Sequence, residues 1–107
     1  MRYDVFLTRD AEEDIFEIYT YVATHDSPGR AKRLFNNLKS TCLGLNEFPE
    51  RGHTPPELER IDVFEFLQIH FKPYRIIYQI RGNEVYIHCV LDGRRELQGL
   101  LQHRLLR

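Results

Sequence analysis

The sequence predicts one α+β domain over residues 1–107, with an N-terminal strand, an antiparallel helical hairpin, a mainly antiparallel sheet of about four strands and a C-terminal tail or short helix. Three patterns predict this class: apolar and polar residues alternate at the start, apolar residues recur at helical spacing in the next two segments, and strand-like runs fill the second half. A chain of this length buries a core without needing a disulfide or a metal.

The first strand is expected at residues 2–7, where apolar and polar side chains alternate. A helix is expected over residues 9–24, because Thr8 suits the N-cap position and acidic residues occupy the first turns, where the helix dipole favours them. Its apolar residues follow the i, i+4, i+7 spacing of one helical face. The chain therefore begins with a strand that leads directly into an amphipathic helix.

A second helix is expected from Pro28 to about Asn46, with Ser27 as its cap and proline at its first position. The break between the two helices is so short that they should form an antiparallel hairpin. Residues 48–59 contain three prolines and a glycine, and we expect an irregular loop there.

Three strands are expected at about residues 63–71, 74–81 and 84–91, with Gly82-Asn83 as a two-residue hairpin turn. That turn predicts a register with one face towards the core. Its pairs are Ile80 with Val85, Tyr78 with Ile87, Ile76 with Cys89, and Tyr74 with Leu91. The opposite face should be a mixed surface that presents Arg75, Arg81 and His88. After Gly93, leucines at helical spacing predict a short helix, or a tail that orders only against a partner.

Composition narrows the classes of protein. No segment is apolar enough to span a bilayer, and charged residues near the N-terminus argue against a secretion signal, so we expect a cytoplasmic protein with no membrane partner. Cys42 and Cys89 stand at apolar positions without a CxxC partner, as expected of inert core thiols.

Charge is distributed unevenly along the chain. Residues 1–26 carry seven acids against two bases, whereas residues 66–107 carry seven bases against three acids. A basic C-terminal part can bind nucleic acid or an acidic protein, but the same counts also arise from ordinary solvated faces.

Familiar motifs of metal and cofactor enzymes are absent from the sequence. There is no glycine-rich phosphate loop, no HxxxH pair, no acidic metal cluster and no GxSxG elbow, so we expect no cofactor and no metal. The five histidines lack metal-ligand spacing, and each is expected to be structural or solvated. His70 and His88 are kept as candidate site residues, because both should face away from the predicted core.

Arginines are the remaining candidates. Arg75 and Arg81 lie on predicted strands, and Arg94 and Arg95 follow the last strand. A guanidinium group can bind a phosphate through two hydrogen bonds and can stabilise the charge that develops in phosphodiester cleavage. The alternative is that these arginines are ordinary solvated surface residues. This alternative is weaker for Arg75, because the side chain of a residue in the middle of a strand points to a fixed face of the sheet.

Several short pieces, in this order, resemble the RelE/ParE toxin superfamily. They are Val5-Phe6-Leu7-Thr8 with Ala11 and Asp14-Ile15, Tyr21-Val22, Phe48-Pro49 with Gly52 and Pro56-Glu57-Leu58, Tyr74-Arg75-Ile76-Ile77-Tyr78, and Val90-Leu91 with Gly93-Arg94-Arg95. The resemblance covers nearly the whole chain and implies the toxin of a type II toxin-antitoxin pair. It also implies a strand, a helical hairpin and an antiparallel sheet, in agreement with the pattern above.

The resemblance implies one of two activities. RelE-like members cleave messenger RNA in the ribosomal A site, whereas ParE-like members poison DNA gyrase. The cleaving members use lysines in the strand before the Tyr-Arg motif, the motif arginine, a later arginine and a C-terminal tyrosine. Arg75 matches the motif arginine, and Arg94 or Arg95 matches the later one. Residues 64–70 contain no lysine, and residues 97–101 contain no tyrosine.

We therefore expect a ParE-like gyrase poison. The alternatives are a ribosome-dependent endoribonuclease acting on messenger RNA, with His70 or His88 as the base beside Arg75 and Arg94 or Arg95, or an inactive relative that only binds an antitoxin. The resemblance also implies a cognate antitoxin on the helical hairpin. The expected target-binding residues are Arg75, Arg94, Arg95 and Arg104, and the expected antitoxin-binding residues are Ile18, Val22, Leu34 and Leu38.

Overall fold

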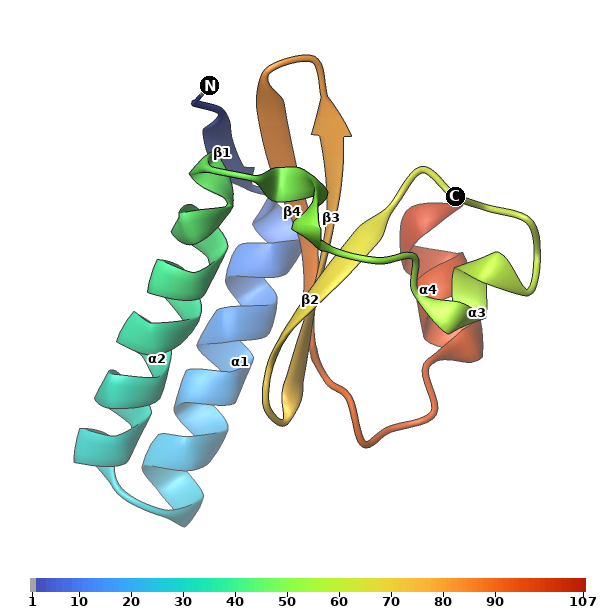
Figure 1. The fold of residues 1–107 in the computed structure, drawn as a ribbon. Helices are drawn as coiled ribbons and strands as arrows, with labels where there is room; N and C mark the ends of the chain where they lie inside the picture. The colour runs from blue at the N-terminus through green and yellow to red at the C-terminus, as the bar shows by residue number, and fades with distance from the viewer. Residues whose placement is uncertain (1) are drawn as a thin grey trace.

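The computed structural model describes residues 2–107, which form a four-stranded sheet covered by helices on both faces (Figure 1). The strands are ordered β1-β4-β3-β2 across the sheet. Helices α1 and α2 lie on one face, and α3 and α4 lie on the other. The main elements are β1 (Asp4–Leu7), α1 (Arg9–His25), α2 (Pro28–Leu43), α3 (Pro56–Glu59), β2 (Leu67–Phe71), β3 (Tyr74–Arg81), β4 (Glu84–Asp92) and α4 (Gln98–Leu105).

The strand and helical hairpin at the start of the chain are confirmed. The hydroxyl of Thr8 accepts a hydrogen bond from the Ala11 amide at 3.1 Å, and that of Ser27 accepts one from the Arg30 amide at 3.1 Å, so both predicted caps form. β1 is two residues shorter than expected and pairs with β4 in parallel. α2 ends at Leu43, and one 3-10 turn carries the helical path on to Asn46.

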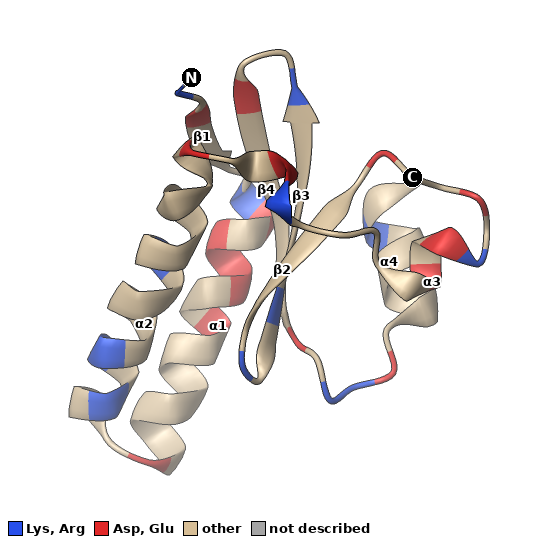
Figure 2. Cartoon of the chain, viewed as in Figure 1, with Lys and Arg blue, Asp and Glu red and all other residues tan. Residues whose placement is uncertain are grey.

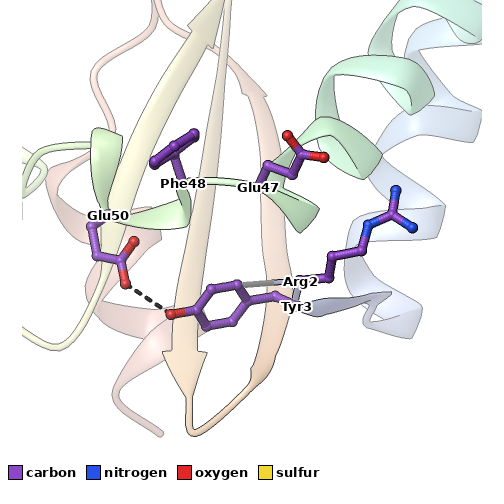
Figure 3. Close-up of a pocket in the computed structure, with 5 residues that line it drawn as sticks. All are labelled: Arg2, Tyr3, Glu47, Phe48 and Glu50. Atoms are coloured by element: carbon purple, nitrogen blue, oxygen red, sulfur yellow. Dashed lines mark hydrogen bonds between the residues drawn. The ribbon is translucent and has the colours of Figure 1, made fainter.

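The expectation of an irregular loop over residues 48–59 is wrong. A 3-10 turn spans Pro49–Arg51, and α3 spans Pro56–Glu59. Pro49 and Pro56 each stand at the first position of a turn, where the missing amide hydrogen would have had no partner, and Pro55 is the N-cap of α3. Tyr3, which directly precedes β1, donates its hydroxyl hydrogen to Glu50 of the 3-10 turn at 3.0 Å (Figure 3).

The predicted register of the β3–β4 hairpin is correct only up to a bulge. From Arg81 opposite Glu84 to Tyr78 opposite Ile87 the pairs match the prediction. β4 then contains one extra residue, so Ile77 stands opposite Cys89 and Arg75 stands opposite Leu91. The bulge moves the side chains beyond it to the other face.

Two apolar clusters result, one on each face of the sheet. The first cluster lies between the sheet and the helical hairpin of α1 and α2. It contains Ile76, Tyr78, Val85, Ile87 and Val90 from the sheet, with Ala11, Ile15, Leu38, Cys42 and Leu45. The second cluster contains Ile77, Cys89 and Leu91, with Leu58, Phe66, Leu97 and Leu101. The expected placement of Cys89 and Leu91 under the hairpin is therefore wrong, and so is the expected open face, because α3 and α4 cover it.

The C-terminal segment is ordered as α4, with Leu97 and Leu101 buried against the second face. Figure 2 shows the charges of the two hairpin helices: acids gather on the N-terminal half of α1, whereas every charged residue of α2 is basic. Within residues 2–107, no helix has the length and apolar character that crossing a membrane requires.

Candidate functional site

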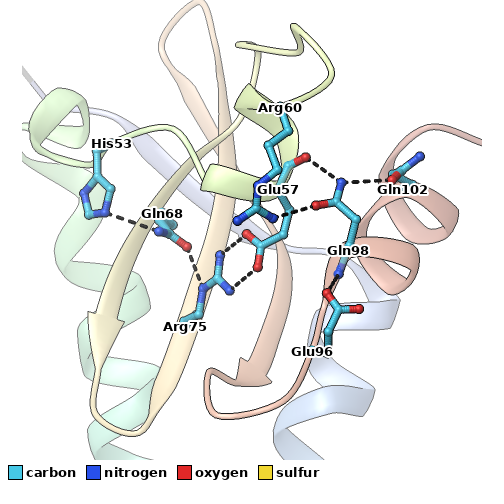
Figure 4. A network of polar contacts seen from close by, with 8 residues as sticks. All are labelled: His53, Glu57, Arg60, Gln68, Arg75, Glu96, Gln98 and Gln102. Carbon is cyan, nitrogen blue, oxygen red and sulfur yellow. Dashed lines mark hydrogen bonds and ion pairs between the residues drawn. The ribbon is translucent and has the colours of Figure 1, made fainter.

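Arg75 lies in a closed network between the sheet and α3 (Figure 4). Its two terminal nitrogens donate to the two carboxylate oxygens of Glu57 at 2.8 and 2.7 Å, and its Nε donates to Gln68 Oε1 at 2.8 Å. The Arg75 and Glu57 side chains are only 10% and 12% exposed. The hydrogen bond from Arg75 is the largest cause that lowers the pKa of Glu57. All three guanidinium nitrogens are thus engaged by the protein itself.

The network continues through Gln68 to His53. Arg75 Nε can only donate, so the Gln68 oxygen faces Arg75 and the Gln68 amide nitrogen faces His53 Nε2, 3.2 Å away. His53 Nε2 then accepts the hydrogen bond that the Gln68 amide nitrogen donates. Backbone hydrogen bonds in both directions between His53 and Gln68, at 3.2 and 2.7 Å, hold the two residues together.

On its other side the network reaches α4. The Gln98 amide nitrogen donates to the Glu57 carbonyl at 2.7 Å, and Arg60 donates to the Gln98 side-chain oxygen at 2.9 Å. The Gln98 backbone amide is capped by Glu96 at 2.8 Å. Polar contacts therefore fasten α3 and α4 to each other over Arg75 and hold both helices against the sheet.

Gly93 closes the space beside the Arg75 stem. A Cβ at Gly93 would stand 2.8 Å from both Cγ and Cδ of Arg75, closer than real Cβ contacts. The Gly93 amide donates to the Pro73 carbonyl at 2.8 Å, which keeps the chain at this separation. Only glycine fits between the two segments.

A second buried ion pair fixes the bulge of β4. Arg104 from α4 donates to both oxygens of Asp14 from α1 at 3.2 and 3.0 Å, and also to the His88 carbonyl at 3.0 Å. Asp14 in turn accepts from the Val90 amide at 3.0 Å. Burial raises the pKa of Asp14, and the hydrogen bond from Arg104 opposes that rise. Because β1 pairs with β4 only as far as Ile87, Asp14 and Arg104 supply hydrogen-bond partners for the Val90 amide and the His88 carbonyl.

The two candidate histidines lie on the face that α3 and α4 cover. His70 is exposed, stands opposite Arg75 on the neighbouring strand, and stacks on His53 with ring centroids 5.6 Å apart. His88 is half-buried beside Gln79, with 3.3 Å between Nε2 and the amide oxygen. Burial is the largest cause that lowers the pKa of each ring. Both rings therefore favour the neutral form.

An open groove of about 700 Å³ separates α1 from the ends of β3 and β4. Ile18, Tyr21 and Val22 line its α1 side, and Arg94 and Arg95 lie on the opposite rim. The remaining lining residues are Asp14, Glu17, His25, Asp26, Tyr74, Val90, Leu91 and Asp92. The groove brings together two residues expected to bind the antitoxin and two expected to bind the target.

The two rim arginines differ in their contacts. Arg94 is paired with Asp92 at 2.7 Å, and its hydrogen bond lowers the pKa of Asp92 to about 2. The Arg95 side chain is exposed and makes no hydrogen bond or ion pair within residues 2–107. Arg95 is thus the rim cation that is available to a partner.

Three expected site residues are less accessible than the sequence predicted. Arg75 is buried in its ion pair, and the Arg104 side chain is 14% exposed against Asp14. Leu38 is fully buried in the first cluster, while Leu34 only packs against that cluster's edge. These positions follow from the second covered face and from the tight packing of the hairpin.

The partners of the buried arginines were not predicted as site residues. Asp14, Glu57 and Gln68 complete the two networks. The available signal was the pattern shared with the superfamily, which includes Asp14 and Glu57. A buried arginine requires a carboxylate partner. Asp14 and Glu57 each lie next to apolar residues in that pattern, which is where a buried acid would be expected.

Comparisons with known proteins agree with this fold. A family model described as the ParE toxin of the type II toxin-antitoxin system parDE matches residues 5–97. Toxin ParE3 of Caulobacter vibrioides is 28% identical over 98 residues, which cover 91% of this chain and 93% of that protein.

Solved structures share the fold at low sequence identity. The chromosomal ParDE system from P. aeruginosa matches with a TM-score of 0.70 and 18% identity, over 83% of this chain and 94% of that one. The RelBE2 toxin-antitoxin complex from Mycobacterium tuberculosis matches with a TM-score of 0.64 and 20% identity, over 86% and 92%. A mutant of E. coli toxin RelE in the free state matches with a TM-score of 0.64 and 16% identity, over 100% and 98%.

The family model covers residues 5–7 of β1, the other three strands and both helices of the hairpin, and it includes both buried ion-pair acids. The chain therefore belongs to the ParE toxin family of type II toxin-antitoxin systems.

Proposed function

We propose that this toxin inhibits DNA gyrase in the cytoplasm. The observation that carries the proposal is the closed state of Arg75, the residue that matches the motif arginine of RNA-cleaving relatives. Three of the five guanidinium N–H groups donate to Glu57 and Gln68, and the Arg75 side chain is only 10% exposed, so its charge is neutralised by Glu57 and largely closed to a phosphate. Membership of the ParE family supports the same target.

Ribosome-dependent cleavage of messenger RNA is the second candidate. It is favoured by His70, an exposed ring with a lowered pKa that stands opposite Arg75 on the neighbouring strand. A neutral imidazole is suited to act as a general base. Cleavage would also need a free arginine and an acid for the leaving oxygen, and Arg75 would have to leave Glu57 first. An inactive relative that only binds an antitoxin is the third candidate.

We further propose that a cognate antitoxin covers the groove between α1 and the ends of β3 and β4. Two of the structural relatives are described as a toxin-antitoxin system or complex. Ile18 and Val22 offer an apolar wall to such a segment, and Arg95 offers a positive charge on the rim. Leu34 is a peripheral contact, and Leu38 supports the hairpin from within.

Two assays on the purified toxin separate the candidates. Added to gyrase and relaxed plasmid, the toxin should reduce supercoiling, whereas messages in a translating extract should stay intact when mapped by primer extension. New message ends with unaffected gyrase would replace the proposal with the RNA-cleaving candidate. Neither effect, together with no growth arrest on expression, would support the inactive relative.

For the groove, Ile18→Asp should abolish antitoxin binding, since a carboxylate on the apolar wall would lose its water without gaining a partner. The matched control is Phe16→Asp, an exposed apolar residue on the same helix that does not line the groove. If the antitoxin binds the Ile18→Asp variant as tightly as the unmodified toxin, it docks elsewhere.

A further inference from the structure

Phe48 holds a large aromatic ring in solvent. Its side chain is 77% exposed, and its backbone is left-handed, with φ 51° and ψ 53°, a region that disfavours residues with a Cβ. The following residue, Pro49, holds this backbone in place, because Pro49 is buried and its carbonyl accepts a hydrogen bond from the hydroxyl of the buried Tyr78. The fold therefore presents this ring rigidly at the surface, although burying it would be favourable.

The ring overhangs a hollow of about 440 Å³ between the N-terminal strand and the turn that follows α2 (Figure 3). Tyr3 lies across the hollow from Phe48, and its hydroxyl donates to Glu50 at 3.0 Å. Glu47 and Arg2 complete the lining. Within residues 2–107, neither the Glu47 carboxylate nor the Arg2 guanidinium makes a hydrogen bond or an ion pair.

The residues that line the hollow favour a positively charged group as its ligand. Two aromatic side chains line the hollow, and the face of an aromatic ring attracts a positive group. The two carboxylates also outweigh the single positive charge of Arg2. An anionic group would be repelled by Glu47 and Glu50. An apolar group would displace water from these two carboxylates without replacing the hydrogen bonds that the water makes to them. The guanidinium group of an arginine or the ammonium group of a lysine can interact with both the aromatic rings and the carboxylates.

We propose that this hollow receives an arginine or lysine side chain of a protein partner, with Phe48 and Tyr3 as aromatic walls and Glu47 and Glu50 as counter-charges. The site lies outside the residues that line the groove on α1 and outside the Arg75 network. It does not depend on whether gyrase or the ribosome is the target.

An NMR titration of the full-length, isotope-labelled toxin tests the site. The probes are the capped peptides Gly-Arg-Gly and Gly-Lys-Gly, with Gly-Glu-Gly as the charge-reversed control. The basic peptides should cause saturable shifts at Tyr3, Glu47 and Phe48 with a dissociation constant on the order of millimolar, as expected for a single side chain. Shifts there no larger than those caused by Gly-Glu-Gly would overturn the proposal.

Variants distinguish a binding role from a structural one. Phe48→Asn removes the ring and inserts a residue that tolerates left-handed backbone, so the fold should be kept while peptide affinity falls roughly tenfold. Glu47→Gln should also weaken binding, because it removes one counter-charge. Phe64→Asn is the matched control, since Phe64 is 58% exposed and does not line the hollow. Unchanged peptide affinity in a folded Phe48→Asn variant would refute the site.

Discussion

Arg75 and Glu57 face each other in a buried ion pair, with two hydrogen bonds of 2.8 and 2.7 Å joining β3 to α3. Both residues belong to the short pieces by which the sequence resembles the superfamily. Asp14, another residue of those pieces, is paired with Arg104 and holds Val90 at the bulge. The recognisable pieces of the sequence therefore build the scaffold.

Removing one partner of the Arg75–Glu57 pair should destabilise the protein strongly. Arg75→Ala and Glu57→Ala should each lower the free energy of unfolding by about 3–5 kcal/mol, because each leaves a buried charge without its partner. The measurement is urea denaturation followed by circular dichroism. A loss below about 1 kcal/mol in both variants would mean that the pair is open in solution.

The double variant Glu57→Leu/Arg75→Met separates structure from activity. Replacing both charges with apolar side chains of similar size should recover most of the lost stability. If Arg75 has only a structural role, this folded variant should still arrest growth. A stable double variant that no longer arrests growth would return Arg75 to the functional residues.

Acid should weaken the protein partly through Glu57. Arg75 lowers the pKa of Glu57 below its usual value of 4.5, so the folded state holds this carboxylate ionised more strongly than the unfolded state. The resulting stabilisation is complete above about pH 4.5 and is lost as the pH falls through the lower folded pKa. Unfolding free energies of the wild type and Glu57→Gln should therefore converge as the pH falls below about 4.5.

Two glycine substitutions should have opposite effects. Gly93→Ala places a methyl group 2.8 Å from the Arg75 stem and should cost about 1–3 kcal/mol of stability. Gly99→Ala lies in α4 with nothing within 4 Å of the added Cβ, and it should stabilise the protein by about 0.5–1 kcal/mol. Thermal melting measures both. An equal response would show that the segment at Gly93 is not packed against Arg75.

The two cysteines should be inert in the folded protein. Cys42 and Cys89 are fully buried, and burial raises the pKa of each thiol to about 12. Since the thiolate is the reactive form, a disulfide reagent should label neither residue in native buffer and both in denaturant. Rapid labelling of Cys89 in native protein would show that α4 opens readily from the sheet.

Local patterns were sufficient to predict most of the fold. The caps at Thr8 and Ser27 placed both hairpin helices within a few residues, and Gly82-Asn83 placed the tight turn between β3 and β4. These features depend on neighbouring residues only, which is why periodicity and turn chemistry identify them.

The candidate site depended on contacts that the patterns do not contain. The bulge after Ile87 adds one residue and turns Cys89 and Leu91 to the other face, and no turn signal marks it. α3 lies within a proline-rich segment and covers Arg75 from 18 positions away. Arg75, which was predicted on an open surface, is buried for this reason.

The most direct test of the central claim is the trapping of gyrase on DNA. Purified toxin should cause linear plasmid to accumulate when gyrase reactions are stopped with detergent and protease, and the Glu57→Leu/Arg75→Met variant should do the same. If neither protein traps cleaved DNA at concentrations that arrest growth, the assignment of gyrase as the target is wrong. If only the wild type does so, the assignment of Arg75 to the scaffold is wrong.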